Sequence, residues 1–408
     1  MSGLLLQYEV VTVAALHMSP LIERLERETR EHHARLEALP CFQALSAHTL
    51  PPERQRLLLQ VLTLLEQELT AALALAPPSA WAPVTAHVPP RPALLAGDVV
   101  PEVPQDAAPD PVLIGAIALG ERMRATAHRE PVLLLGHHYA LRLALFPHPG
   151  ASPWNDFAHG LEGVALGAAE ETALVRTVHE TFSHVRGLLD ALHPPRELPP
   201  MHWLNREAGN HPITLDLDSL RAALRAAEAA WEEFPYYAWR FGERGRQFGW
   251  SDSAWLASFS GQAEEHVWAH VSWLGTLLAP RGMPRFMLER HLYVLHEELV
   301  RGKPAHAERH DVLRRVADRL AEERRRVLDD QTLYTLSADF ETRVGADSSH
   351  QPRGMGKLLV AAVADECQGI TQAVPSLTRW MYERPGFPAS WLRAVEETLG
   401  RARSRVKG

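Results

Sequence analysis

Two adjacent histidines near the start of the chain have the residue type and position to bind a metal. They lie in the run TREHHARLE, which extends from Thr29 to Glu37. At 3.6 residues per turn, Thr29 and His33 share one face of the predicted helix with apolar side chains, and His32 is rotated about 100° away. A neutral imidazole on such a face can bind a metal ion. A packed or exposed histidine has the same spacing, so this helix alone leaves ligation open.

Two later runs add chemistry of the same kind. PVLLLGHHY extends from Pro131 to Tyr139, and the pair Thr181-Phe182 lies in a predicted helix further along the chain. Together with the first run, they resemble the heme oxygenase family, especially the bacterial type that occurs beside phytochromes. The family patterns are Thr-basic-x-x-His-x-x-x-Glu, Pro-x-Leu-Leu-x-Ala-His-x-Tyr and Ala-x-x-Thr-Phe. The resemblance covers residues 19–192.

The resemblance implies a helical bundle that holds b-type heme as its cofactor. It makes His33 the proximal ligand of the heme iron and places Thr29, Glu37 and Tyr139 in the cofactor-binding region. The activity that it implies is the opening of heme to biliverdin, carbon monoxide and iron, with dioxygen and electrons from an external donor, which a redox partner would deliver.

The sequence departs from this family where the distal helix is expected. After His-x-Tyr the family continues with a Gly-Asp-Leu-x-Gly-Gly stretch, but this chain has ALFPHPG from Ala144 to Gly150. Pro147 and Pro149 cannot continue a regular helix. Without the glycines and the aspartate, backbone donors and an ordered proton path are missing, so we expect impaired oxygenase activity. His148 lies within this break, and the sequence allows either a position near the open side of the iron or a surface loop.

Periodicity predicts an all-α protein with two domains. Apolar residues recur at spacings of three and four, and period-two alternation is missing. We expect an N-terminal extension over 1–18, a heme-oxygenase-like bundle over 19–192, a Pro-rich linker over 193–203 and a second helical bundle over 204–408. The expected helices cover 20–38, 52–75, 110–127, 130–146, 169–192, 216–233, 251–279, 284–301, 306–329, 356–382 and 388–403, and loops are expected over 77–111 and 343–354.

The second half contains a histidine pair with the spacing of metal ligands. His266 and His270 are four residues apart, so both imidazoles fall on one helix face and could clamp a metal or a second heme. His291 and His296, on the next predicted helix, could complete such a site. No Glu-x-x-His signature of a di-iron bundle occurs here, and buried or interface histidines remain the alternative.

An aromatic and basic run from Phe234 to Phe248 is the most distinctive part of the second half. Aromatic rings interleaved with arginines can stack on a flat ligand, but such a helix junction is more often part of a core. Ser251 or Asp252 is a plausible N-cap of the helix expected to follow. The chain has no nucleotide-binding, hydrolase or kinase signature.

Composition narrows the class of protein. The formal net charge of −8 argues against nucleic-acid binding. Cys41 and Cys367 are far apart in sequence, so neither a disulfide framework nor a zinc cluster is predicted, and a reducing cytoplasm is the expected location. The apolar stretch from Val10 to Leu16 is too short to cross a bilayer, and we expect no membrane partner.

Three functional hypotheses follow. The chain is a heme oxygenase, or a catalytically impaired heme-binding protein that acts as a sensor, carrier or scaffold, or a non-heme iron protein on the same fold. The altered distal segment favours the second over the first. The third ranks last because the first half lacks an evident set of iron ligands.

Overall fold

The computed structural model describes residues 20–77, 110–145, 160–161, 164–195, 197–345, 351–384 and 386–406. Throughout these ranges the regular structure is helical and no strand occurs, which confirms the all-α prediction. The described chain divides into two compact units, 1–198 and 199–408. The expected extension over 1–18, most of the loop over 77–111, and His148 lie outside the described residues.

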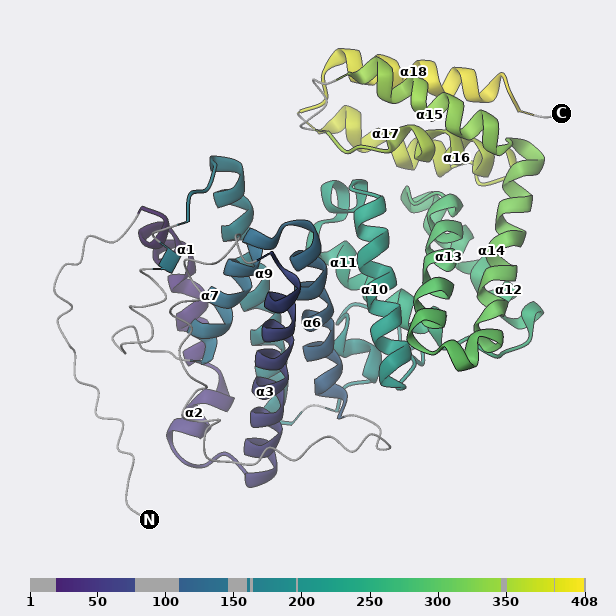
Figure 1. The fold of residues 1–408 in the computed structure, drawn as a ribbon. Helices are drawn as coiled ribbons and strands as arrows, with labels where there is room; N and C mark the ends of the chain where they lie inside the picture. The colour runs from purple at the N-terminus through teal and green to yellow at the C-terminus, as the bar shows by residue number, and fades with distance from the viewer. Residues whose placement is uncertain are drawn as a thin grey trace. The chain divides into compact units, whose positions relative to one another are not determined.

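The first unit is a bundle built around one almost fully buried helix. Its elements are α1 (Pro20–Glu37), α2 (Pro40–Ser46), α3 (Pro52–Leu75), α6 (Pro111–Arg129), the short 3₁₀ helix η2 (Pro131–Leu133), α7 (Leu134–Leu145) and α9 (Ala168–Leu192). The central helix is α6, which packs against α3, α7 and α9. Figure 1 shows α3 and α6 side by side.

Close approach of α3 and α6 depends on a glycine. A Cβ at Gly120 would lie 2.6 Å from Cγ of Glu68, so any side chain there would force Glu68 to move. Glu68 is buried and accepts hydrogen bonds from Arg124 at 3.0 and 2.7 Å. The pair therefore links the two helices through a charge-assisted contact.

Only one described helix has the length and composition of a membrane span. This is α3, whose most apolar window has a mean hydropathy of 1.4 and is 56% buried within the protein. A core helix of a bundle has the same properties.

The second unit consists of two groups of helices that share α13. The elements are η3 (Pro200–Trp203), α10 (Leu217–Glu233), α11 (Tyr236–Ala257), α12 (Glu264–Leu278), η4 (Ala279–Arg281), α13 (Arg285–Gly302), η5 (Pro304–His306), α14 (Ala307–Val327), α15 (Asp330–Val344), α16 (Met355–Cys367), α17 (Ala373–Glu383) and α18 (Ala389–Arg403). In the first group, α13 packs against α10 and α14. In the second group, α16 packs against α13, α15, α17 and α18. Met201 and Trp203, in the segment predicted as linker, are buried in the structure.

Two predicted long helices are each divided by a glycine. The helix expected over 251–279 is in fact the end of α11 followed by α12, with Gly261 between them at φ +79. The helix expected over 356–382 is α16 followed by α17, with Gly369 between them at φ +92. Left-handed backbone ends a helix, and glycine adopts it without a steric penalty.

Three α-helical segments in the described part of the chain were not predicted. They are α2, α15 and the part of α11 before residue 251. In α11, Gly242 has φ 55 and ψ −154, so the helix is kinked there. Its glycine-rich sequence hides the helical pattern, and packing against α10 and α13 holds the segment helical.

Candidate functional site

The predicted proximal histidine lies at the inward edge of α1. Ile22, Leu25, Thr29 and Leu36 form the buried face of this helix, and His33 is half-buried beside them. Its ring meets the ring of Phe182, on α9, edge-on at a centroid distance of 5.4 Å. Glu37 is exposed.

Thr29 joins α1 to α7. Its hydroxyl donates to the carbonyl of Leu25 at 2.8 Å and lies 3.4 Å from the hydroxyl of Tyr139. Because a threonine hydroxyl has one proton, the Tyr139 phenol is the donor in the second contact. Both side chains are buried, and burial raises the pKa of Tyr139, so it stays protonated at neutral pH.

The histidine after Gly136 joins α7 to α9. His137 is fully buried, and its Nδ1 lies 2.8 Å from the hydroxyl of Thr181. Its Nε2 lies 3.4 Å from the hydroxyl of Thr126. Both ring nitrogens therefore have protein partners, which suits a structural role rather than ligation.

The electrostatics of His33 favour a neutral imidazole. Burial lowers its pKa, and the nearby Glu37 opposes this shift only in part. Within the described part of the chain, neither ring nitrogen of His33 forms a hydrogen bond. A neutral, half-exposed imidazole without a hydrogen-bond partner is available to an incoming metal.

His32 has different surroundings. Its ring lies 4.8 Å from the ring of His179 and stacks on Phe182 at 5.7 Å. Burial lowers its pKa, with further lowering by His179. The two neighbouring histidines are therefore distinguishable by mutation.

The histidine pair on α12 is close together but incomplete as a metal site. The rings of His266 and His270 are 4.5 Å apart, and Nδ1 of His270 hydrogen bonds the carbonyl of His266 at 2.9 Å. His291 lines a separate cavity, and His296 pairs with Asp311 at 3.2 Å. No group of three or more histidine, cysteine or acidic residues placed to hold a metal ion occurs among the described residues.

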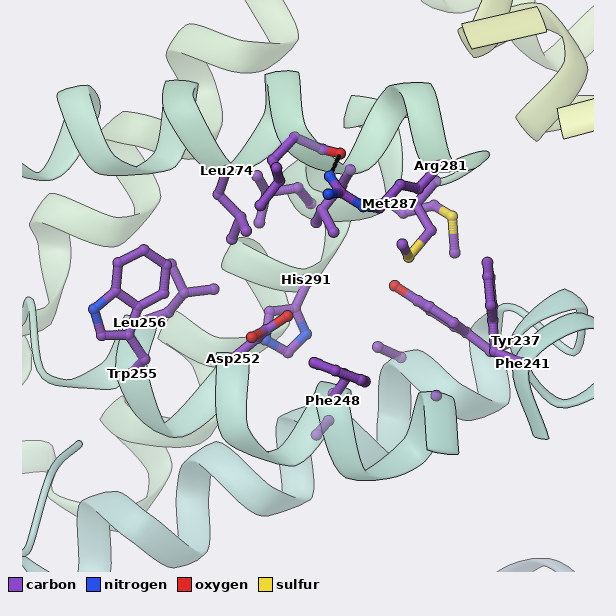
Figure 2. A pocket seen from close by; sticks show the side chains of 18 of the residues that line it. Tyr237, Phe241, Phe248, Asp252, Trp255, Leu256, Leu274, Arg281, Met287 and His291 are labelled. Carbon is purple, nitrogen blue, oxygen red and sulfur yellow. Dashed lines mark hydrogen bonds between the residues drawn. The ribbon is translucent and has the colours of Figure 1, made fainter. Parts of the chain in front are cut away.

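The second unit contains a cavity of about 530 Å³ between α10, α11, α12 and α13. Its volume is in the range of pockets that hold small organic molecules. Much of the wall is aromatic. Figure 2 shows Tyr237, Phe241, Phe248 and Trp255 around the cavity.

Helix α11 contributes bare backbone as well as rings to this wall. Gly245 and Gly249 both line the cavity, and a Cβ at Gly249 would meet no atom within 4 Å. Open space therefore lies directly over the helix backbone at this point. A flat molecule can approach such a surface more closely than one covered by side chains.

Five arginines line the cavity, and three of them are neutralised by acids. Arg244 pairs with Glu207 at 2.7 Å, Arg246 with Glu228 at 3.2 Å and Arg285 with Asp365 at 2.8 Å. The other two, Arg240 and Arg281, form no ion pair with any described residue.

Arg240 lies beside the turn that contains Arg281 and Gly282. A Cβ at Gly282 would lie 1.9 Å from Nη1 of Arg240, so this guanidinium rests against the residue that follows Arg281. Arg240 hydrogen bonds the hydroxyl of Tyr236 and lies 5.0 Å from the centroid of the Phe241 ring. Arg281 is exposed and hydrogen bonds only the carbonyl of Leu277. Two cations without acidic partners thus lie at one end of the cavity.

Three polar groups without strong partners lie deeper in the cavity. Asp252 forms no hydrogen bond or ion pair in the described structure, and burial raises its pKa to about 7. Nε2 of His291 is buried without a partner, and burial lowers the pKa of this imidazole to about 4. Burial, with a further contribution from Asp252, raises the pKa of Tyr237. Figure 2 shows the Asp252 carboxylate and the Tyr237 hydroxyl directed toward the interior.

The aromatic and basic run from Phe234 to Phe248 is divided between core and cavity. Phe234 and Tyr236 belong to the hydrophobic core, whereas Arg240, Phe241 and Phe248 line the cavity. The N-cap role expected for Ser251 or Asp252 is wrong, because α11 begins at Tyr236 and both residues lie inside it. The sequence signal for a cavity residue was an acidic side chain, Asp252, after a glycine-rich aromatic run. The role of a helix N-cap explained the same pattern equally well.

Comparisons with protein-family models, with curated proteins and with solved structures find no match to this chain.

Proposed function

We propose that the first unit is a heme-binding unit of the heme oxygenase type, with His33 as the axial ligand of the iron. The main support is that the three runs that carry the sequence resemblance meet in space. Thr29 on α1 bonds Tyr139 on α7, and His33 on α1 contacts Phe182 on α9. Helix periodicity alone would not bring residues 29, 139 and 182 together.

The surroundings of His33 suit an axial ligand of a heme iron. The imidazole is neutral, half-buried and without a hydrogen bond, so one nitrogen lone pair is free to bind iron. When bound there, heme supplies an iron that can activate dioxygen. The Thr29–Tyr139 hydrogen bond joins α1, the helix that carries His33, to α7. The charge of Glu37 raises the pKa of His33 and so favours the protonated imidazole when heme is absent.

Binding, rather than efficient cleavage, is the activity that we propose. The segment from Ala144 to Gly150 lacks the glycines and the aspartate of the family pattern and contains two prolines. Because proline has no backbone N–H group and the glycines are missing, we expect few backbone donors close to bound dioxygen. The oxygenase reaction, with an external electron donor, is the alternative, and no observation favours a non-heme iron site.

The test is the absorption spectrum of the full chain during titration with hemin. We expect a saturable Soret band that His33→Ala removes or shifts strongly, with an affinity loss of about tenfold or more. Imidazole in solution should restore the band in this variant, because it can occupy the vacated axial position. His32→Ala is the matched control and should leave the spectrum nearly unchanged. Loss of the band in His32→Ala alone would move the ligand to that residue, and no effect in either variant would refute the assignment.

A second measurement separates a binder from an enzyme. Under a reductant in air, we expect the heme spectrum to persist or bleach slowly, with little biliverdin. Rapid conversion with an equal yield of carbon monoxide would establish the oxygenase alternative.

A further inference from the structure

The cavity of the second unit is independent of the proposed heme site. All of its lining residues lie between Met201 and His291, within the unit 199–408. Its features identify a ligand class through three separate observations: the shape of its walls, the cations at one end, and the polar groups in its interior.

The walls favour a planar molecule. Aromatic side chains come from α11 and from the neighbouring helices α10 and α12. Trp231 and Tyr237 are stacked with an interplanar angle of 10°, and Trp255 and Trp273 meet edge-on at 6.2 Å. The bare backbone at Gly249 leaves open space beside these rings. Rings of this kind bind flat conjugated systems by stacking and edge contacts.

The cations favour an acidic group on that molecule. Arg240 and Arg281 line the cavity and form no ion pair within the described residues, whereas the other three lining arginines are each held by a carboxylate. Guanidinium groups that lack an acidic partner recognise a carboxylate through charge-assisted hydrogen bonds. An anionic ligand would supply the partner that the protein does not.

The interior favours a hydrogen-bond donor at the other end of the molecule. Asp252 has no bonding partner, and its oxygens border the cavity. The imidazole of His291 also has none, and its Nε2 is buried. Asp252 is partly buried, and its carboxylate has no donor within the protein, so an N–H group that reaches it would form a strong hydrogen bond.

We propose that this cavity binds a planar conjugated molecule that carries a carboxylate and a ring N–H group, the carboxylate on Arg240 and Arg281 and the N–H on Asp252. The orientation follows from the separation of the two polar ends by the aromatic wall. Neither His33 nor any other residue of the first unit takes part.

The experiment uses the full chain and β-carboline-3-carboxylate, a fluorescent planar tricycle with one ring N–H and one carboxylate. Fluorescence anisotropy gives its affinity. The methyl ester of the same compound tests the acid, and the N-methyl derivative tests the ring N–H. We expect saturable binding of the acid and weakening by about tenfold or more for either derivative.

Protein variants test each end of the proposed site. The double variant Arg240→Gln, Arg281→Gln should weaken the acid by about tenfold or more and leave the ester unaffected. Arg314→Gln, a surface change in the same unit, is its control. In Asp252→Ala, the preference for ring N–H over N-methyl should disappear.

A third variant tests the location without removing a charge. In Gly249→Leu the new side chain enters open space, so the unit should fold while the cavity is filled. Gly400→Leu is matched to it, since Gly400 is also helical and a Cβ there would meet no atom within 4 Å. The unfolding midpoint of each variant verifies folding.

Several outcomes would overturn the proposal. These are the absence of saturable binding, equal affinity of acid and ester, and equal losses in Gly249→Leu and Gly400→Leu. Failure of hemin to bind, or an effect of His33→Ala on hemin alone, bears only on the first unit. The two proposals therefore stand or fall separately.

Discussion

Replacing Asp252 by asparagine should stabilise the second unit at neutral and alkaline pH and leave its stability in acid almost unchanged. The Asp252 carboxyl lies in the cavity wall and lacks a partner, and burial raises its pKa from 3.8 to about 7. The folded protein therefore keeps this proton over a pH range in which the unfolded chain has lost it. Asparagine has nearly the same shape and is neutral at every pH.

The sign and size of the effect follow from proton linkage. Between about pH 4 and pH 7 the folded state binds one more proton than the unfolded state, so stability falls with rising pH by about 1.4 kcal/mol per unit. Full retention of this shift gives a penalty on the order of 4 kcal/mol above pH 7. Water within the cavity lessens the desolvation, and we expect about 1 to 3 kcal/mol.

His291 acts in the opposite direction in the wild-type protein. Burial lowers its pKa to about 4, so the unfolded state binds the extra proton between that value and about 6.5, and this contribution makes stability rise with pH. The Asp252 effect must therefore be read from the difference between wild type and Asp252→Asn, in which the His291 contribution cancels.

The assay is urea unfolding of the full chain between about pH 4 and pH 8.5, followed by tryptophan fluorescence. Nine of the eleven tryptophans lie at position 203 or later, so this signal reports mainly on the second unit. Glu297→Gln, an exposed change on α13, is the control. Parallel curves for wild type and Asp252→Asn would refute the claim that this carboxyl is desolvated and unpaired.

Two further predictions concern the helix contacts. Gly120→Ala should lower the free energy of unfolding of the first unit by about 1 to 3 kcal/mol, because the new Cβ forces the Glu68 side chain to move. Gly187→Ala is the control and should not lower it, because open space surrounds Gly187. Circular dichroism during urea unfolding measures both variants. Arg324→Met should cost the second unit about 3 to 5 kcal/mol, since it leaves the buried carboxylate of Glu289 without its partner at 2.9 Å. An equal loss in Arg319→Met, whose side chain is more exposed, would contradict the second prediction; tryptophan fluorescence measures both variants.

The helical class and most helix positions could be predicted because they depend on local spacing. Apolar residues at three and four positions apart define α1, α3 and α9 closely. The divided helices show the limit of this reasoning. Gly261 and Gly369 could have been tolerated inside helices, but in the structure both adopt left-handed backbone between two helices.

The first candidate site could be predicted in part. Residue types and spacing placed Thr29 and His33 on one helix face, and the structure agrees, with Thr29 buried and His33 half-buried. That Thr29 meets Tyr139, and that His33 meets Phe182, depends on how α1, α7 and α9 pack, which no local pattern encodes.

By itself, the sequence determined the helical class, the helix faces and the aromatic and basic character of the run from Phe234 to Phe248. Tertiary structure alone decided which of these side chains enter the core and which face a cavity. Asp252 illustrates the reason. In the sequence it is an acidic residue with the features of a helix cap, but α11 begins at Tyr236 and Asp252 lines the cavity between α10, α11, α12 and α13 without a partner. Burial and pairing are properties of contacts between distant segments, so they exist only once the chain has folded.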